Sequence, residues 1–97
     1  MQRLKILTVC GFGVGSSLVL KMKLDELLKE EGIDAHVETA DVGSASSTPC
    51  DIIFTSKELS EKLTSTVVVP VISVSNFIDK NEIKEAGLEK IKELIGA

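Results

Sequence analysis

The stretch LKILTVC at residues 4–10, followed by GFGVGSS at residues 11–17, organises the rest of the chain. Its first seven residues are an apolar run rich in β-formers, which is typical of a buried strand. Three alternating glycines interrupt the run, and Ser16 or Ser17 is placed to cap a following helix. A strand that passes through a glycine-rich turn into a helix begins a β-α-β unit, so this stretch predicts an α/β fold.

The segments that follow continue the alternation of strands and helices. The helix after the loop is expected to reach about Glu31, with four leucines on one face and Gly32 placed for a left-handed cap. Further strands are predicted at residues 34–40, 51–55 and 66–74, and a short helix at 56–63. Pro70 indicates that the last of these strands lies at an edge or contains a bulge. The serine-rich segment 41–49 is predicted to be a loop, in which the pattern does not reveal whether a further short helix occurs.

The final helix is expected to begin after a cap at Asp79 or Asn81. Its predicted apolar stripe consists of Ile83, Leu88, Ile91, Leu94 and Ile95. Gly87 is expected to weaken the middle of this helix by about 1 kcal/mol relative to alanine. The whole order predicts a small, doubly wound, Rossmann-like sheet of four parallel strands in the order 2-1-3-4, with helices on both faces. A length of 97 residues indicates one domain, residues 1–97.

Composition and charge argue against several classes of function. The net charge is −4 and the only aromatic residues are three phenylalanines, so nucleic-acid binding is not expected. No apolar run reaches about 18 residues and the N-terminus lacks a signal-peptide pattern, so we expect a cytoplasmic protein with no membrane insertion. Two cysteines and one histidine are too few for a usual structural zinc site, and no metal or cofactor is predicted.

The glycine-rich loop combines a thiol with a potential anion site. Ligands of open parallel sheets bind beyond the carboxyl ends of the strands, where Cys10 is predicted to lie. The glycines allow successive N–H groups to point inward, and the following helix adds the positive end of its dipole. The same environment favours the nucleophilic thiolate. The loop therefore predicts attack of Cys10 on phosphorus, with phosphate bound by Gly11, Phe12, Gly13, Val14, Gly15, Ser16 and Ser17.

Other interpretations of the loop remain open. The plainest is a strand–turn–helix junction with a buried cysteine and no ligand. A Walker A loop would need a Gly-Lys-Ser/Thr ending and a dinucleotide site would need GxGxxG, and the loop has neither. A cysteine phosphatase of the low-molecular-weight type carries arginine where this chain has Ser16. Without a guanidinium, transition-state charge is poorly held, which favours keeping a phosphoryl group for a partner over hydrolysing it. A non-covalent anion- or nucleotide-binding module is the third alternative.

The motif CGFGVGSS at residues 10–17 resembles the IIB components of the bacterial phosphoenolpyruvate-dependent sugar phosphotransferase system (PTS), of the lactose/ascorbate/galactitol type. The segment around Lys21-Met22-Lys23, the Asp51-Ile52-Ile53 strand and the valine-rich fourth strand ending at Asn76-Phe77 are most similar to ascorbate-specific IIB proteins. The resemblance implies a phosphotransferase component in which Cys10 accepts phosphate from a phosphohistidine of a IIA protein. The phosphocysteine would then pass it to sugar, by this likeness ascorbate, bound by a membrane IIC protein. Phe12 and Val14 would contact these partners at the loop rim.

Three further residues carry chemistry that the loop does not use. Cys50 precedes the third strand and is interpreted as a packed or partly buried thiol. His36 is predicted on the polar face of the second strand, where a solvated side chain is the plainer interpretation and phosphate relay the alternative. Asp41 follows the second strand and would bind a ribose only if the loop held a nucleotide, which its glycine spacing disfavours.

Overall fold

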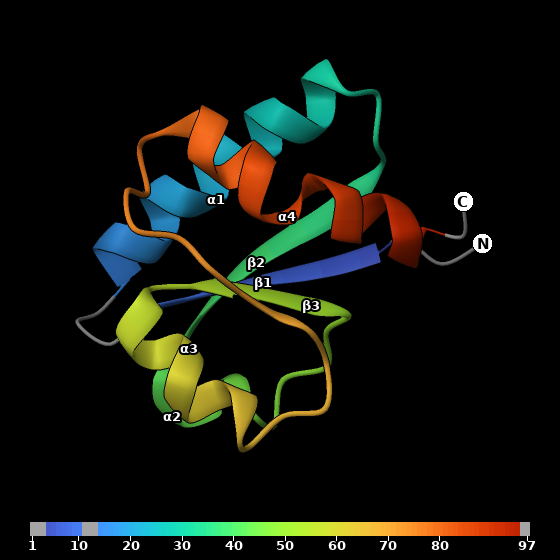
Figure 1. Ribbon diagram of the computed structural model, residues 1–97. Coiled ribbons are helices and arrows are strands. Elements are labelled where there is room, and N and C mark those ends of the chain that lie inside the picture. Colours follow the sequence, from blue (N-terminus) through green and yellow to red (C-terminus); the bar gives the residue numbers. More distant parts are fainter. Residues whose placement is uncertain (1–3, 11–13, 96–97) are drawn as a thin grey trace.

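The computed structural model describes residues 4–10 and 14–95; for Cys10 and residues 14–17 it describes the backbone. Strands and helices alternate along this part of the chain. The elements are β1 (Leu4–Cys10), α1 (Val14–Glu30), β2 (Ala35–Asp41), α2 (Val42–Ala45), β3 (Ile52–Thr55), α3 (Lys57–Thr64), β4 (Val71–Ser73) and α4 (Lys80–Leu94). The strands form one parallel sheet in the order β2-β1-β3-β4, which confirms the predicted topology. Helices α1 and α4 cover one face and α2 and α3 the other (Figure 1).

Strand β1 is central because both of its faces are apolar. Side chains alternate across a strand, so Leu4 and Ile6 join the core under α1 and α4, while Leu7 and Val9 join the core under α2 and α3. Hydrogen-bonded neighbours flank β1 on both sides, and Ile6 pairs with Val37 of β2 and with Ile52 of β3. A strand buried in this way is typical of the centre of a doubly wound sheet.

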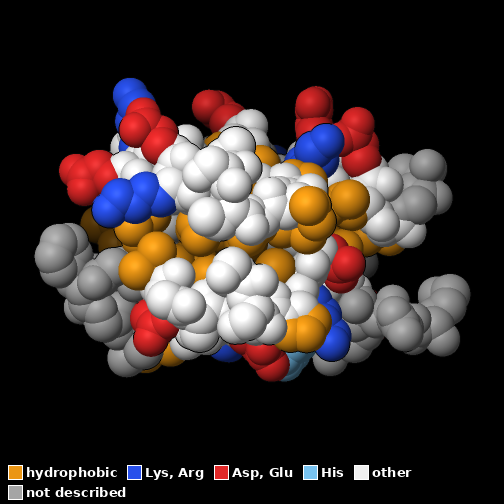
Figure 2. All heavy atoms as spheres, turned by 90° about the horizontal axis from the view of Figure 1, so that it is seen from below, with side chains coloured by type: hydrophobic (Ala, Val, Ile, Leu, Met, Phe, Trp, Pro, Cys, Tyr) orange, Lys and Arg blue, Asp and Glu red, His pale blue; other side chains and the backbone are white. Residues whose placement is uncertain are grey.

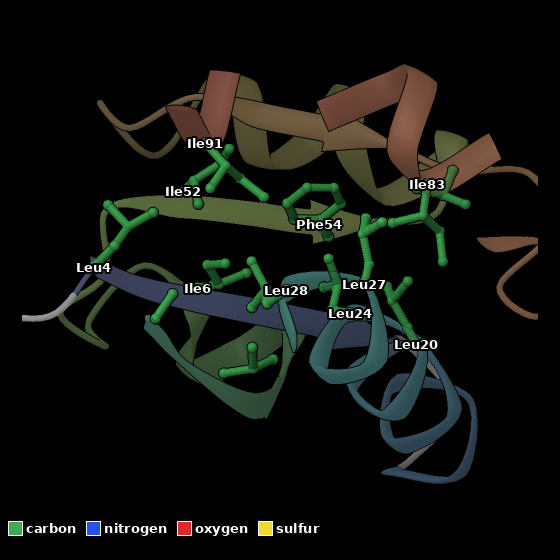
Figure 3. Close-up of a cluster of buried hydrophobic side chains, with 13 residues drawn as sticks. Leu4, Ile6, Leu20, Leu24, Leu27, Leu28, Ile52, Phe54, Ile83 and Ile91 are labelled. Carbon is green, nitrogen blue, oxygen red and sulfur yellow. The ribbon is translucent and has the colours of Figure 1, made fainter. Parts of the chain in front are cut away.

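The larger core lies between the sheet and the α1/α4 layer (Figure 3). Helix α1 contributes the predicted leucine face, which consists of Leu20, Leu24, Leu27 and Leu28. The helix ends in a Schellman motif, as Ile33 N–H donates to the Leu28 carbonyl at 2.8 Å and Gly32 N–H to the Lys29 carbonyl at 3.3 Å. Gly32 has a φ of 69°, which confirms the predicted left-handed cap.

The start of α1 differs from the prediction, and the serine-rich segment proves to contain a helix. Helix α1 begins at Val14, so Ser16 and Ser17 lie in its first turn, and the prediction that one of them caps it is wrong. The serine-rich segment does contain a short helix, α2, whose N-cap is Asp41. Predicting α2 was difficult because four residues are too few to display a helical period.

On the α2/α3 side, a band of hydrophobic side chains runs across the face, and charged side chains gather at its margins (Figure 2). Helix α3 is short, with 8 residues capped by Ser56. The apolar side chains packed around the smaller core, between the sheet and α2/α3, are only partly buried: Ala40, Cys50, Leu59, Val67, Val69 and Val71.

Strand β4 is shorter than predicted, since only Val71–Ser73 is extended and paired. Pro70 precedes it and has no N–H to donate, although its carbonyl accepts from Ile53 N–H at 2.9 Å. The strand lies at the sheet edge, as the proline indicated.

Helix α4 is capped by Asp79, one of the two predicted caps. Its buried residues are Ile83, Gly87, Leu88 and Ile91. The predicted stripe is wrong at its end, because Leu94 and Ile95 are 38% and 49% exposed. Glu31, directly after α1, reaches Lys84 and Lys92 of α4 through ion pairs, so the end of α1 offers charged contacts to α4 there.

Candidate functional site

The carboxyl ends of β1 and β3 form the topological switch point of the sheet. From β1 the chain continues into α1 on one face, and from the neighbouring β3 it continues into α3 on the other (Figure 1). Ligands of doubly wound sheets bind in the crevice that this divergence creates. Cys10 is the last residue of β1, so its backbone lies at this crevice, as the sequence predicted.

The predicted phosphate-binding residues divide into two groups. Gly11, Phe12 and Gly13 lie outside the described residues. Val14, Gly15, Ser16 and Ser17 form the first turn of α1. The N–H groups of a first turn lack intrahelical acceptors, and α1 carries no acidic residue there. The positive end of a 17-residue helix therefore starts within four positions of Cys10, in a place that favours an anion.

Two threonine hydroxyls hold the end of β1 in place. Thr55 Oγ1 donates to the Val9 carbonyl at 2.9 Å, and both residues have no exposed surface. On the other side, Thr8 Oγ1 donates to the Glu38 carbonyl at 3.3 Å. These bonds join β1 to both neighbours directly before Cys10, so they position the backbone from which the thiol projects. Sequence reasoning missed this role of Thr55, whose only signal is a hydroxyl at the end of an otherwise apolar strand.

Asp41 lies beside Cys10, because the two residues are partners in the β1–β2 register. Its Oδ1 accepts from Ser44 N–H at 2.8 Å and from Ser44 Oγ at 2.7 Å, which caps α2. The Ser44 hydroxyl and then the Ser44 N–H lower the pKa of Asp41. The carboxylate is therefore a fixed negative charge at the edge that carries Cys10. This capping role accounts for an aspartate at position 41 without the ribose contact that a nucleotide-binding loop would require.

His36 and Cys50 are not brought to this edge. His36 pairs with Lys5 at the start of β1, and its exposed ring lies 2.8 Å from Glu38 Oε1. Cys50 precedes β3 and is therefore at the amino end of the sheet, opposite Cys10. It packs partly buried against the smaller core, as predicted. Desolvation, and then the charge of Asp51, raise the pKa of the Cys50 thiol, so it is a poor nucleophile at neutral pH.

Within residues 4–10 and 14–95, no three histidine, cysteine or acidic side chains are grouped closely enough to hold a metal ion. In the same part of the chain, none of the helices has the length and apolar character needed to cross a bilayer.

Comparison with known proteins finds relatives that cover most of the chain. Residues 5–89 match the family "PTS system, Lactose/Cellobiose specific IIB subunit". The ascorbate-specific PTS EIIB component of Escherichia coli O157:H7 is 37% identical over 91 residues, which cover 92% of this chain and 90% of that protein. The corresponding component of Mycoplasma pneumoniae is 33% identical over 87 residues, covering 88% and 92%.

A solved structure is similar in fold. The lactose-specific IIB domain of Streptococcus pneumoniae superposes with a TM-score of 0.68 over 97% of this chain and 96% of that one, at 12% identity. An identity this low supports the fold alone, whereas the family match and the curated relatives span most of the sequence. The chain therefore belongs to the lactose/cellobiose-type family of PTS IIB subunits.

Proposed function

We propose that the protein is a phosphoryl carrier in which Cys10 is phosphorylated by a IIA protein and then phosphorylates a sugar bound by a membrane IIC protein. The observation that carries this proposal is the place of Cys10 at the switch point, between the end of the central strand and the start of α1. Membership of the IIB family supports the same role, since IIB subunits are phosphotransferase components. A cytoplasmic site of action, at the inner face of the membrane, follows from this role.

Two displacements at phosphorus account for the carrier step. In the first, the electron pair of the Cys10 thiolate forms an S–P bond while the P–N bond of the donor phosphohistidine breaks and its electron pair returns to the imidazole. In the second, a sugar hydroxyl oxygen attacks phosphorus, the S–P bond breaks, the thiolate is regenerated and the hydroxyl proton is released to solvent. Both steps require positioning and charge stabilisation more than covalent help from the protein.

The first turn of α1 and the residues before it would bind the phosphoryl oxygens. On this proposal Gly11, Phe12 and Gly13 complete the cradle, and the amides of residues 14–17 supply donors at a helix N-terminus. Ser16 stands where a phosphatase of the low-molecular-weight type has arginine. A site without a bidentate guanidinium stabilises the hydrolytic transition state less well, which suits a carrier that must hold the phosphoryl group until the acceptor binds.

Ascorbate is the proposed sugar, because the curated relatives at 33% and 37% identity are named as ascorbate-specific components. The partners would dock next to the thiol. Leu18 and Met22 follow the first turn of α1 on its outer side and are 49% and 55% exposed. Large apolar side chains so close to a reactive centre are typical of a protein-binding surface.

Mass spectrometry tests the proposal directly. The protein is incubated with phosphoenolpyruvate, enzyme I, HPr and a IIA protein of the ascorbate system, and we expect one phosphoryl group per chain. Cys10→Ser should abolish this labile modification. Cys50→Ser is the matched control and should retain it, because Cys50 lies at the opposite end of the sheet.

Two results would contradict the proposal. Loss of the label in Cys50→Ser, with retention in Cys10→Ser, would refute the assignment of the nucleophile. Rapid turnover of an aryl phosphate by the isolated protein would favour the phosphatase interpretation.

A further inference from the structure

Charged side chains of both signs lie at the carboxyl edge of the sheet, and one of them, the Glu82 carboxylate, accepts from Ser75 N–H and Asn76 N–H beyond the end of β4. Among the described residues that end a strand or follow it by at most two positions, Asp41 is the only anion and Lys57 the only cation. Asp41 is on β2 and Lys57 follows β3, and β1 lies between these two strands. Cys10 therefore stands between a negative and a positive group that come from distant parts of the sequence.

The register places Lys57 on the β3 side of Cys10. Val9 pairs with Thr55, and the hydrogen bond between Thr55 Oγ1 and the Val9 carbonyl holds these two residues together. One position further along each chain are Cys10 and Ser56, the N-cap of α3, and the next residue is Lys57, the first of the helix. Adjacent strands are roughly 5 Å apart, a separation that the four-methylene stem of a lysine can span.

Lys57 is exposed and available to an anion. Several other lysines are within ion-pair distance of carboxylates, among them Lys21 with Asp25 and Lys80 with Glu26. Within residues 4–10 and 14–95, Lys57 has no carboxylate at that distance. Glu58 is adjacent in sequence, but consecutive helical residues do not face each other. Glu61, four residues further, shares a face of α3 with Lys57, yet the two form no ion pair in the described part of the chain.

We propose that Lys57 assists phosphoryl transfer, because its ammonium group stabilises the negative charge at Cys10, first on the thiolate and then on the phosphoryl oxygens. This inference rests on the proposed function. Residues 11–17 contain no lysine or arginine, so the cradle itself supplies only neutral donors and the helix dipole. The Asp41 carboxylate, which accepts hydrogen bonds from Ser44, repels an anion on the β2 side of Cys10. Lys57 attracts the same anion toward the crevice between α1 and α3. A lysine acts as a point charge without the fixed fork of arginine, which suits an acceptor that must release its phosphoryl group.

The test compares two lysines of one helix. Lys57→Gln removes the charge at the start of α3, and Lys62→Gln removes another exposed charge in its last turn. Both are made with Cys50→Ser, which leaves Cys10 as the only cysteine of the chain. The first readout is the pKa of Cys10 from the pH dependence of its alkylation by iodoacetamide, a measurement that needs no partner protein. The second is the rate at which the protein accepts phosphate from phosphorylated IIA.

We expect Lys57→Gln to raise the pKa of Cys10 by about 0.5 unit and to slow phosphoryl acceptance about threefold, because a nearby cation favours the thiolate. Lys57→Arg should restore both values, and Lys62→Gln should match the parent. The shift should shrink in 1 M salt, where the Debye length is about 3 Å. Equal values for Lys57→Gln and Lys62→Gln, or a shift that persists undiminished in 1 M salt, would overturn the proposal. Failure of the parent protein to accept phosphate at Cys10 would instead overturn the proposed function, since the alkylation measurement is independent of it.

Discussion

Replacing Gly87 by alanine tests how closely α4 approaches the sheet. A Cβ atom at this position would lie 2.3 Å from Cζ and 2.5 Å from Cε2 of Phe54. Phe54 has no exposed surface and belongs to the larger core, so its ring can retreat only by displacing other buried side chains (Figure 3). Alanine in place of glycine would add about 1 kcal/mol to helix stability, whereas overpacking a core costs about 1–3 kcal/mol. Contacts this short belong at or above the upper end of that range, so we expect a net loss of about 2 kcal/mol.

Urea denaturation followed by far-ultraviolet circular dichroism measures this loss, since the chain has no tryptophan or tyrosine to report by fluorescence. The midpoint should fall while the slope m stays constant, and the melting temperature should drop by about 10 °C. Phe54→Leu in the Gly87→Ala background should recover part of the stability, because the smaller side chain relieves the contact.

Gly43→Ala is the matched control. A Cβ at Gly43 would make only an ordinary contact of 3.5 Å with Asp41 Oδ1, so this change should be neutral or stabilising by about 0.5 kcal/mol. The reasoning about Gly87 would be refuted if Gly87→Ala raised the midpoint, because helix propensity would then outweigh the packing against Phe54.

Three further predictions concern local features. Gly32→Ala should destabilise the protein by about 1 kcal/mol in the same urea assay, because the residue has a φ of 69°; an unchanged midpoint would contradict the Schellman cap. Ser44→Ala should raise the pKa of Asp41, measured by NMR titration of its carboxyl. The lowered pKa of Asp41 stabilises the folded parent above the ordinary aspartate pKa of about 4, and this stabilisation is lost as the pH falls through the pKa of the folded state. The variant lacks this contribution, so its stability should fall less on acidification. Cys50 should react with iodoacetamide at neutral pH more slowly than a free thiol, since burial raises its pKa, and faster labelling in Cys10→Ser would contradict this placement.

Much of the fold could be predicted because its elements are marked by short-range patterns. Residues Leu4–Cys10 form a strand with the predicted bounds, and the leucines of α1 lie on one helical face. The predictions failed where a pattern was too short or its covering partner was unknown. Helix α2 has four residues, and β4 begins only after Pro70. Leu94 and Ile95 at the end of α4 are exposed, and the apolar period of α4 by itself does not indicate how far the layer that covers it extends.

The candidate site divides in the same way. The sequence by itself determined the thiol, the glycine-rich loop and the helix that follows, because these features are contiguous and their chemistry depends on near neighbours. The tertiary structure decided which distant residues share an edge with Cys10. Pairing of β1 with β2 and β3 brings Asp41, Thr55 and Lys57 to this edge. Packing of α4 on Phe54 leaves no room for a Cβ at position 87, so the glycine that lowers helix propensity is needed there. The physical reason is that strand register and helix packing join residues far apart in the chain, and no local period encodes them.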